Sequence, residues 1–501
     1  MKNSISISLI LIILLISCTV KNPNTRYEAE IVHGLNNLES EYEAICKQAG
    51  MEVWEYYSDP GKKSMTKYKE RFSGFFMNDS TIRNINNWNS KISEISNDTL
   101  IRRLELWKSI ITCAQVDFNP EIIDLQNILE AQLSNYPSDD ISDDELEKSI
   151  INLIRLRNDK SKDLGYGNYA YMVLQNTGND TIWFENLILR IDSASCGKYD
   201  KFIQDHFPDS SQIEYGDLVK YIIQSYTIND NPVIEDSQKK GLIHETLLNI
   251  GIEVDSLPIQ FEIAKLPPGI GGFGNCIDIP NDFRAVAMEE LSFYYLLHEI
   301  GHGLHWTGVA VNYPVLKGYE WCTGNLSDIY SESMAEVIAK FSHNRTWLKQ
   351  KGFNETYIDS IQNSRKAIFP LHLRLGLINM LFEIELYRHP EKEPAIVKRE
   401  LYQKYLRVDK DFSKKPNLIR LPYVSYPIYE QNYLMADIVS WQIHEYLSRE
   451  YGEDYVMNPR VGEFLKEKLW KDGELYPWQV RIQKAIGKEL DLKGYLNDFM
   501  E

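Results

Sequence analysis

Residues 294–306 contain the pattern HExxH, in which His298, Glu299 and His302 stand at a fixed spacing. If this stretch is an α-helix, the two imidazole rings leave the same face one turn apart. They can then bind one Zn²⁺ ion at about 2.0–2.1 Å each. Glu299 lies beside them, where its carboxylate can take a proton from water and later deliver one to a leaving amine. The surrounding residues are apolar or aromatic, which favours a buried helix over a chance occurrence of the motif.

A catalytic zinc ion needs a third protein ligand and one open position. A His six residues after His302 is excluded, because that position is Gly308. The other scheme uses a Glu on a following helix, and the segment 327–337 offers Glu332 with Glu336 one turn beyond it. We therefore predict Glu332 as the third ligand, and Glu336 either as the acceptor of a hydrogen bond from a ligand His or as a solvated helix charge. The weaker ligand candidates are Glu320 and Asp328, and His305 is interpreted as a packing residue.

Helical periodicity dominates the rest of the chain. Apolar residues recur at i, i+3, i+4 and i+7 in five segments, near 30–50, 100–115, 121–135, 142–162 and 290–306. Ser142 and Glu145 form a capping-box pattern, and Gly165 provides the matching stop. We predict a mainly α fold with a small sheet near 255–290 and no internal repeat.

The first residues resemble a bacterial lipoprotein signal. A positive start is followed by an apolar run from Ile5 to Ile16, and Ser17-Cys18 ends it in a pattern similar to the lipobox. We expect a signal peptide over 1–17, a lipid anchor at Cys18, a polar tether over 18–30 and one metallopeptidase domain of two helical halves over 31–501. The alternative is a plain signal peptide with an incidental Cys. The expected location is the bacterial cell envelope, at a membrane.

The charge balance argues against one class of partner. Lys and Arg number 54 while Asp and Glu number 72, so the formal net charge is −18. With no basic surplus to neutralise phosphates, nucleic-acid binding is not expected.

The zinc motif resembles that of thimet oligopeptidase-like peptidases, and the Glu332–Glu336 helix is similar to the ligand helix of that group and of the angiotensin-converting-enzyme group. Segments 157–169 and 433–437 also resemble motifs of these zinc peptidases. The resemblance implies an ellipsoidal, mainly helical fold split by a deep cleft. It implies short unfolded peptides as substrates and one catalytic Zn²⁺ ion.

The resemblance also implies roles for residues outside the zinc motif. Tyr433 would donate a hydrogen bond to the oxyanion that forms when water attacks the scissile carbonyl; otherwise it is a core residue of a helix. Gly272, Phe273 and Gly274 fall where these families offer an edge strand to the substrate, and the alternative is an ordinary loop.

The chain departs from the converting-enzyme pattern at three positions. Where those relatives have a His, an Arg and a Lys, this chain has Tyr423, Asn432 and Leu421. A strict dipeptide-releasing activity is therefore in doubt, although Arg420 could hold a terminal carboxylate. The missing oxyanion donor could be replaced by one of three phenols, those of Tyr423, Tyr426 and Tyr429.

These observations lead us to expect a lipid-anchored zinc oligopeptidase in which Glu299 is the general base. One alternative is a dipeptidyl carboxypeptidase of the converting-enzyme type. The other is a non-catalytic peptide-binding lipoprotein on the same scaffold.

Overall fold

The computed structural model describes residues 23–58, 66–134, 136, 142–208, 213–263, 272–288, 290–321, 323–325, 328–408 and 418–500. The mainly helical fold with a small sheet is confirmed. The helices of the first half are α2 (Pro23–Ser58), α3 (Lys67–Phe76), α4 (Asp79–Asn89), α5 (Asp98–Asp117), α6 (Pro120–Ser134), α7 (Asp143–Asp163), α8 (Tyr169–Asn176), α9 (Thr181–His206), α10 (Tyr215–Thr227) and α11 (Asp236–Asn249). Those of the second half are α12 (Phe293–Thr307), α13 (Asp328–Ala339), α14 (Arg345–Gln350), α15 (Glu355–Arg388), α16 (Pro394–Leu406), α17 (Leu421–Ser425), α18 (Glu430–Tyr451), α19 (Arg460–Phe464), α20 (Trp478–Ile486) and α21 (Leu492–Met500).

Short 3₁₀ segments and one π-helical segment connect these helices. The 3₁₀ segments are η1 (Ile92–Glu94), η2 (Ile228–Asp230), η3 (Val254–Ser256), η4 (Pro314–Leu316), η5 (Lys340–His343) and η6 (Tyr455–Met457), and the π-helical segment is η7 (Leu465–Trp470).

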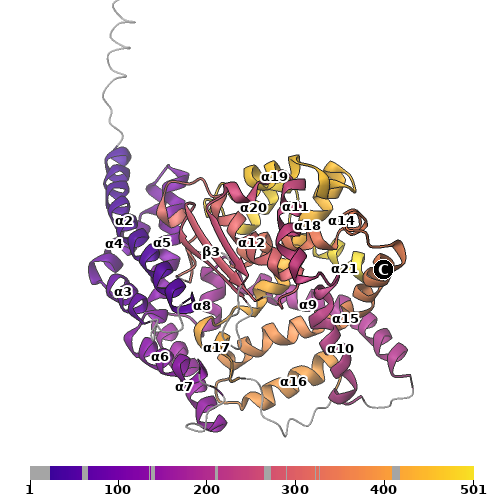
Figure 1. The fold of residues 1–501 in the computed structure, drawn as a ribbon. Helices are drawn as coiled ribbons and strands as arrows, with labels where there is room; N and C mark the ends of the chain where they lie inside the picture. The colour runs from indigo at the N-terminus through magenta and orange to yellow at the C-terminus, as the bar shows by residue number, and fades with distance from the viewer. Residues whose placement is uncertain are drawn as a thin grey trace, which may run out of the picture.

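The sheet lies between the N-terminal helices and the rest of the molecule (Figure 1). Its strands are β1 (Ile259–Ile263), β2 (Gly272–Asp278) and β3 (Asp282–Ala287), in the order β1-β3-β2. β1 pairs with β3 in parallel, and β2 pairs with β3 antiparallel. Within the described ranges, β2 is therefore an edge strand with β3 as its single partner.

Local sequence explains where the predicted helices begin and end. The capping box predicted at Ser142 and Glu145 starts α7, and both of its hydrogen bonds are present. The helix ends at Asp163, two residues before Gly165, whose φ of 90° lies in the left-handed region that favours glycine.

The buried apolar residues form two clusters. One contains residues of α2, α3 and α5 together with Phe283 and Trp306, and the other contains most of the remaining helices. β3 and α12 contribute to both clusters. The HExxH helix therefore lies where the two parts of the core meet.

Among the described residues, α15 is the one helix whose length and composition would suit a membrane span. Of its most apolar window, 78% is buried inside the protein, and the helix packs against α9, α10, α16 and α18. Burial of this kind is typical of a core helix.

The signal peptide and the anchor residue Cys18 lie outside the described residues. The expected tether differs from the structure, because residues 23–30 form the first turns of α2. Four of the cysteines, Cys46, Cys113, Cys196 and Cys276, are free thiols.

Candidate metal centre and cleft

The structure brings His298, His302 and Glu332 together. The Nε2 atoms of the two histidines are 3.2 Å apart. Glu332 places Oε2 3.2 Å from His298 Nε2 and Oε1 3.9 Å from His302 Nε2. The three side chains each offer one ligand atom within 4.8 Å of the others.

Close packing of α12 on α13 makes this arrangement possible. A Cβ atom on Gly301 would lie 2.7 Å from the Cα of Ala335, a distance that real Cβ atoms essentially never show. Gly303 faces β3 in the same way, because a Cβ atom there would lie 2.6 Å from the Phe283 ring. The two glycines let α12 approach both neighbours, so that Glu332 reaches the histidines.

The spacing of the three side chains suits a tetrahedral zinc ion. With metal–ligand bonds of about 2.0–2.1 Å, neighbouring ligand atoms in a tetrahedral site are about 3.3 Å apart. The two 3.2 Å separations agree with that value. Glu332 Oε2 is buried and has no partner in hydrogen-bonding geometry within the described part of the chain. A cation at this point would satisfy it.

Both histidines are oriented through their Nδ1 atoms. His298 Nδ1 lies 3.2 Å from Glu336 Oε1, and His302 Nδ1 lies 3.2 Å from Ser331 Oγ. Tyr294 in turn donates a hydrogen bond to Glu336. With Nδ1 engaged, the two Nε2 atoms face one another, and two lone pairs can share that space only with a proton or a metal ion between them.

The pKa values of Glu332, His302 and His298 also indicate that this centre favours a cation. Burial would raise the pKa of Glu332, but contact with His298 and the charges of both histidines lower it to about 2. Burial lowers the pKa of His302 to about 4, so its ring is neutral at pH 7, as a metal ligand must be. Burial also favours the neutral form of His298, but Glu332 and Glu336 raise its pKa well above the usual range.

Glu299 lies beside this centre and lines the cleft. Burial raises its pKa to about 7. The charge of His298 lowers this pKa, and the charge of Glu332 raises it. Strand β2 approaches it closely, because a Cβ atom on Gly274 would lie 3.5 Å from Glu299 Oε2. A Cβ atom on Gly274 would also lie 2.7 Å from the Phe283 ring, so a glycine at this position lets β2 pass close to both Phe283 and this carboxylate.

The cleft has a cavity volume of about 600 Å³. It contains every member of the predicted site that was expected to meet substrate. They are Gly272, Phe273, Gly274, Glu299, Arg420, Tyr423, Tyr426, Tyr429 and Tyr433. Glu320 and Asp328 also line the cleft, but they are not part of the His-His-Glu group.

The tyrosines that were predicted as candidate oxyanion donors differ in their surroundings. Tyr429 donates a hydrogen bond to Glu332 Oε1 at 2.5 Å, which assigns its phenol to the candidate ligand. Tyr423 is buried beneath Arg420, whose guanidinium lies 5.7 Å from the ring centre. Tyr426 and Tyr433 are about half exposed within the cleft. Tyr433 packs against Tyr429 with ring centres 5.5 Å apart.

Three contacts in this centre were not predicted from the sequence. Helical spacing could have identified Tyr294, which is one turn before His298. Ser331 directly precedes Glu332, but a serine in a helix does not by itself indicate a hydrogen bond to a metal-binding histidine. The hydrogen bond of Tyr429 joins residues 97 positions apart, so nothing local encodes it.

Comparison with known proteins adds evidence on the fold. No family model matches the chain, and no curated protein matches it in sequence. Solved structures do match. A carboxypeptidase from Deinococcus radiodurans has a TM-score of 0.62 at 11% identity, covering 94% of this chain and 99% of its own. Trypanosoma cruzi metallocarboxypeptidase 1 has a TM-score of 0.62 at 13% identity, covering 94% and 98%.

A third similar structure, named as an oligoendopeptidase F from Bacillus anthracis, has a TM-score of 0.54 at 14% identity, with 96% of each chain covered. At these identities the similarity shows the fold. It extends over nearly the whole of this chain and of each similar structure, so the fold is shared as a unit.

Proposed function

We propose that this protein is a zinc metallopeptidase that hydrolyses peptide bonds in short peptides. The observation that carries the proposal is the convergence of His298, His302 and Glu332 beside Glu299 in one cleft. The names of the structural neighbours, which are carboxypeptidases and an oligoendopeptidase, support it.

In the proposed reaction, the two histidines and Glu332 hold the metal ion. A bound zinc ion supplies Lewis-acid activation of water and of the scissile carbonyl. Glu299 accepts the proton of the attacking water and then delivers a proton to the leaving amine. Its pKa of about 7 suits both roles near neutral pH.

Tyr433 stabilises the oxyanion in this mechanism. The residue is about half exposed and lines the cleft. The partial burial of its side chain, together with the charges of Glu332 and Glu430, raises its pKa. The hydroxyl therefore stays protonated and can donate a hydrogen bond to the negative charge that develops in the transition state.

The edge strand β2 positions the substrate. Gly272, Phe273 and Gly274 line the cleft, and the side of β2 away from β3 has backbone groups that an extended peptide can pair with. A peptide on this strand passes Glu299, because Gly274 lies next to that carboxylate.

A C-terminal exopeptidase is the second candidate function. Arg420 is exposed and lines the same cleft, where its guanidinium could bind a terminal carboxylate. Two of the similar structures are carboxypeptidases by name. Release of C-terminal dipeptides is one form of this activity, and peptide binding without catalysis is the remaining alternative.

The test is cleavage of a pool of 6–15-residue peptides, followed by mass spectrometry. Wild type and Glu299→Gln are both loaded with zinc and checked for metal content. We expect wild type to cut, and the variant to keep zinc but lose cleavage. Fragment masses then distinguish internal cuts from removal of C-terminal residues, and peptides blocked at the C-terminus remain substrates only for an endopeptidase. If neither protein cuts while both hold zinc, the peptidase proposal is wrong.

We also propose that the protein is lipid-anchored in the bacterial cell envelope through Cys18. The support is the lipobox-like sequence at residues 15–18. A Cys18→Ser variant should move from the membrane fraction to the soluble fraction, and labelled fatty acid should be incorporated into wild type alone. Equal membrane association of both proteins would contradict the anchor.

A further inference from the structure

One buried arginine outside the cleft contacts the segment that carries three of the cleft tyrosines. This segment, residues 420–429, is called the cleft wall and consists of α17, the residue before it and the turn that leads into α18. Its members that line the cavity are Arg420, Tyr423, Tyr426 and Tyr429. Arg157 of α7 is 2% exposed, is not among the lining residues and has no part in the proposed reaction.

Arg157 holds the cleft wall by its backbone. The Nη2 group donates a hydrogen bond to the carbonyl oxygen of Val424 at 2.7 Å, and the Nη1 group donates one to that of Tyr423 at 3.3 Å. Both carbonyls belong to α17, a helix of 5 residues. The last carbonyls of a helix have no partner within it, so they need donors from elsewhere. The guanidinium therefore fixes the end of α17, where the chain turns towards Tyr426 and Tyr429.

The same arginine joins the cleft wall to the neighbouring helices. Its Nη1 group also donates to the hydroxyl of Tyr387 on α15 at 3.2 Å, and Asn158 donates to the Tyr387 carbonyl at 2.8 Å. The Asn158 amide oxygen accepts the N–H of Tyr169 at 2.9 Å, and the Tyr169 ring centre lies 5.5 Å from the guanidinium carbon. Arg157, Asn158, Tyr169 and Tyr387 are all buried. The segment 157–169, which resembles a motif of zinc peptidases, thus supplies a buried support for the wall.

The charge of Arg157 makes this contact strong. A guanidinium stays protonated near neutral pH, and a buried charge is costly unless its N–H groups are hydrogen-bonded. Nη1 and Nη2 have their acceptors in the wall carbonyls and in Tyr387. Movement of the wall away from Arg157 would leave N–H groups of a buried charge without acceptors. The free energy of that loss keeps the wall in place.

A displacement of the cleft wall would reach the metal centre as well as the substrate. Ser425 donates a hydrogen bond to Glu130 Oε1 of α6 at 2.7 Å, so the wall has a second anchor in the N-terminal half. At its other end, the Tyr429 phenol donates to Glu332 at 2.5 Å. The wall therefore connects α6 and α7 to a candidate metal ligand.

We propose that Arg157 is a positioning residue for the peptidase reaction, and that its hold on the end of α17 sets the place of the wall side chains that contact substrate. This inference rests on the proposed peptidase function and adds a residue outside the cleft to it. Glu299 of α12 and Tyr433 of α18 lie outside the wall. Loss of the contact should therefore weaken substrate binding more than it slows the chemical step.

The test is Arg157→Lys, which keeps the charge but cannot offer two donors in one plane. With zinc-loaded protein, we expect KM for a cleaved peptide to rise by roughly tenfold, as for the loss of a hydrogen bond to a charged group. The value of kcat should change by less than about threefold, since the lost interaction is made in the ground state and in the transition state alike. Hydrogen exchange followed by mass spectrometry should show faster exchange of the wall amides than in wild type.

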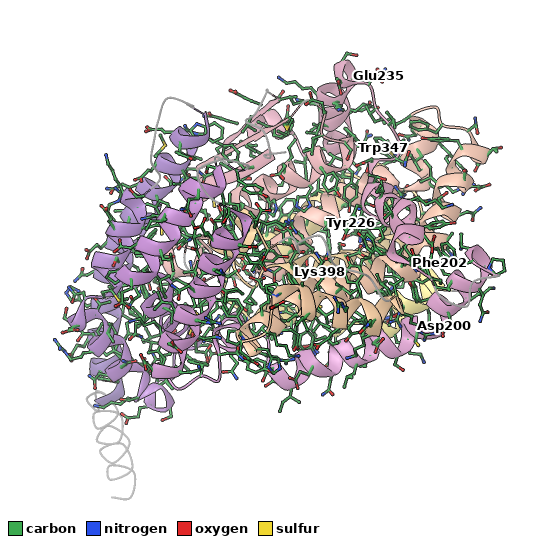
Figure 2. All side chains as sticks on the ribbon, turned by 90° about the horizontal axis from the view of Figure 1, so that it is seen from below. Asp200, Phe202, Tyr226, Glu235, Trp347 and Lys398 are labelled. Atoms are coloured by element: carbon green, nitrogen blue, oxygen red, sulfur yellow. The ribbon has the colours of Figure 1, made fainter. Side chains whose placement is uncertain are left out.

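The matched control is Arg374→Lys. Arg374 is 1% exposed, donates a hydrogen bond to the Tyr405 carbonyl near the end of α16 at 3.0 Å, and lies 5.3 Å from the Tyr199 ring centre. It does not line the cleft. Tyr199 precedes Asp200 of α9, which lies on the side of the molecule away from the N-terminal helices (Figure 2). This variant should lose stability as Arg157→Lys does and exchange faster near the end of α16, while its KM stays at the wild-type value.

Zinc content and thermal unfolding are measured for every variant. Equal changes of KM in the two lysine variants would assign Arg157 a structural role alone and overturn the inference, as would wild-type exchange of the wall in Arg157→Lys. If that variant does not fold, Tyr387→Phe decides the question. It removes one acceptor of the guanidinium at nearly constant shape and should raise KM severalfold, whereas an unchanged KM would overturn the inference.

Failure of the proposed function gives a different result. If wild type cuts no peptide, the peptidase proposal fails, and hydrogen exchange and the calorimetric affinity for the same peptides replace KM. Faster wall exchange and weaker peptide binding in Arg157→Lys, without the same loss of binding in Arg374→Lys, would still show that Arg157 positions the cleft wall. Wild-type exchange and binding would overturn both proposals.

Discussion

At the residue scale, the neighbouring phenols of Tyr429 and Tyr433 have different surroundings. Tyr429 donates its hydrogen bond to Glu332, whereas Tyr433 lines the cleft and is about half exposed. One phenol therefore supports a candidate metal ligand, and the other can reach a substrate.

Replacement of each phenol by Phe should separate these tasks. Tyr429→Phe removes the hydrogen bond to Glu332, and we expect zinc affinity to fall by about 10–100-fold, the range found for partners of metal ligands. Tyr433→Phe should leave zinc affinity unchanged and lower kcat by about 10²–10³-fold, as for the loss of an oxyanion donor. Zinc affinity is measured by competition with a chelator, and kcat at saturating zinc. Equal zinc affinity of Tyr429→Phe and wild type would show that the hydrogen bond has no part in metal binding.

At the scale of secondary-structure elements, the crossing of α12 on α13 determines the centre. His298 and His302 belong to one helix and Glu332 to the other. Their convergence depends on the close approach of the two backbones at Gly301 and Ala335.

Gly301→Ala should therefore damage both stability and metal binding. The new methyl group would meet Ala335 backbone atoms at 2.7 and 2.9 Å, so the helices must separate. We expect a loss of about 1–3 kcal/mol in the free energy of unfolding, together with lower zinc affinity. The control is Gly197→Ala within α9, where a Cβ atom meets nothing within 4 Å. It should be neutral or stabilising by up to about 1 kcal/mol. Denaturant unfolding and zinc titration measure both effects, and wild-type behaviour of Gly301→Ala would contradict the packing argument.

At the scale of the whole molecule, Asp437 links three separate parts of the C-terminal half. Its carboxylate, on α18, accepts hydrogen bonds from Lys340 of η5 and Tyr495 of α21. Burial would raise its pKa, but the charges of Lys340 and His372 and the hydrogen bonds from Lys340 and Tyr495 together lower it.

The lowered pKa predicts a pH dependence of stability. The unfolded chain binds the proton of Asp437 more readily than the folded protein does, so the stabilisation is fully present above about pH 4 and is lost as pH falls through the lower folded value. Asp437→Asn leaves Lys340 without its counter-charge, and we expect a loss of about 3–5 kcal/mol at neutral pH. Urea unfolding of both proteins between neutral and acidic pH measures this difference. It should shrink on acidification, and a constant difference would rule out the ionised carboxylate as its source.

Much of the helical fold and the local part of the site could be predicted from the sequence, because the signals are local. A spacing of four residues places His298 and His302 on one helix face, and the Ser142 capping box depends on residues three apart. The small sheet near 255–290 is predicted from the cluster of Pro and Gly at 266–274, which interrupts the helical periodicity. The pairing of Glu332 with the motif came from a known pattern of spacing, and it remains a prediction until metal binding is measured.

Tertiary structure alone decided which side chains meet across long separations. Nothing in the sequence distinguishes Tyr429 from Tyr426, because that choice depends on the backbone turn at Ile428, whose φ of 59° is unusual for a β-branched residue. Glu383 and Glu430 are also unremarkable in sequence, and they share one cleft only after α15 and α18 pack. Local periodicity encodes the faces of helices. The contacts between those faces depend on how the whole core closes.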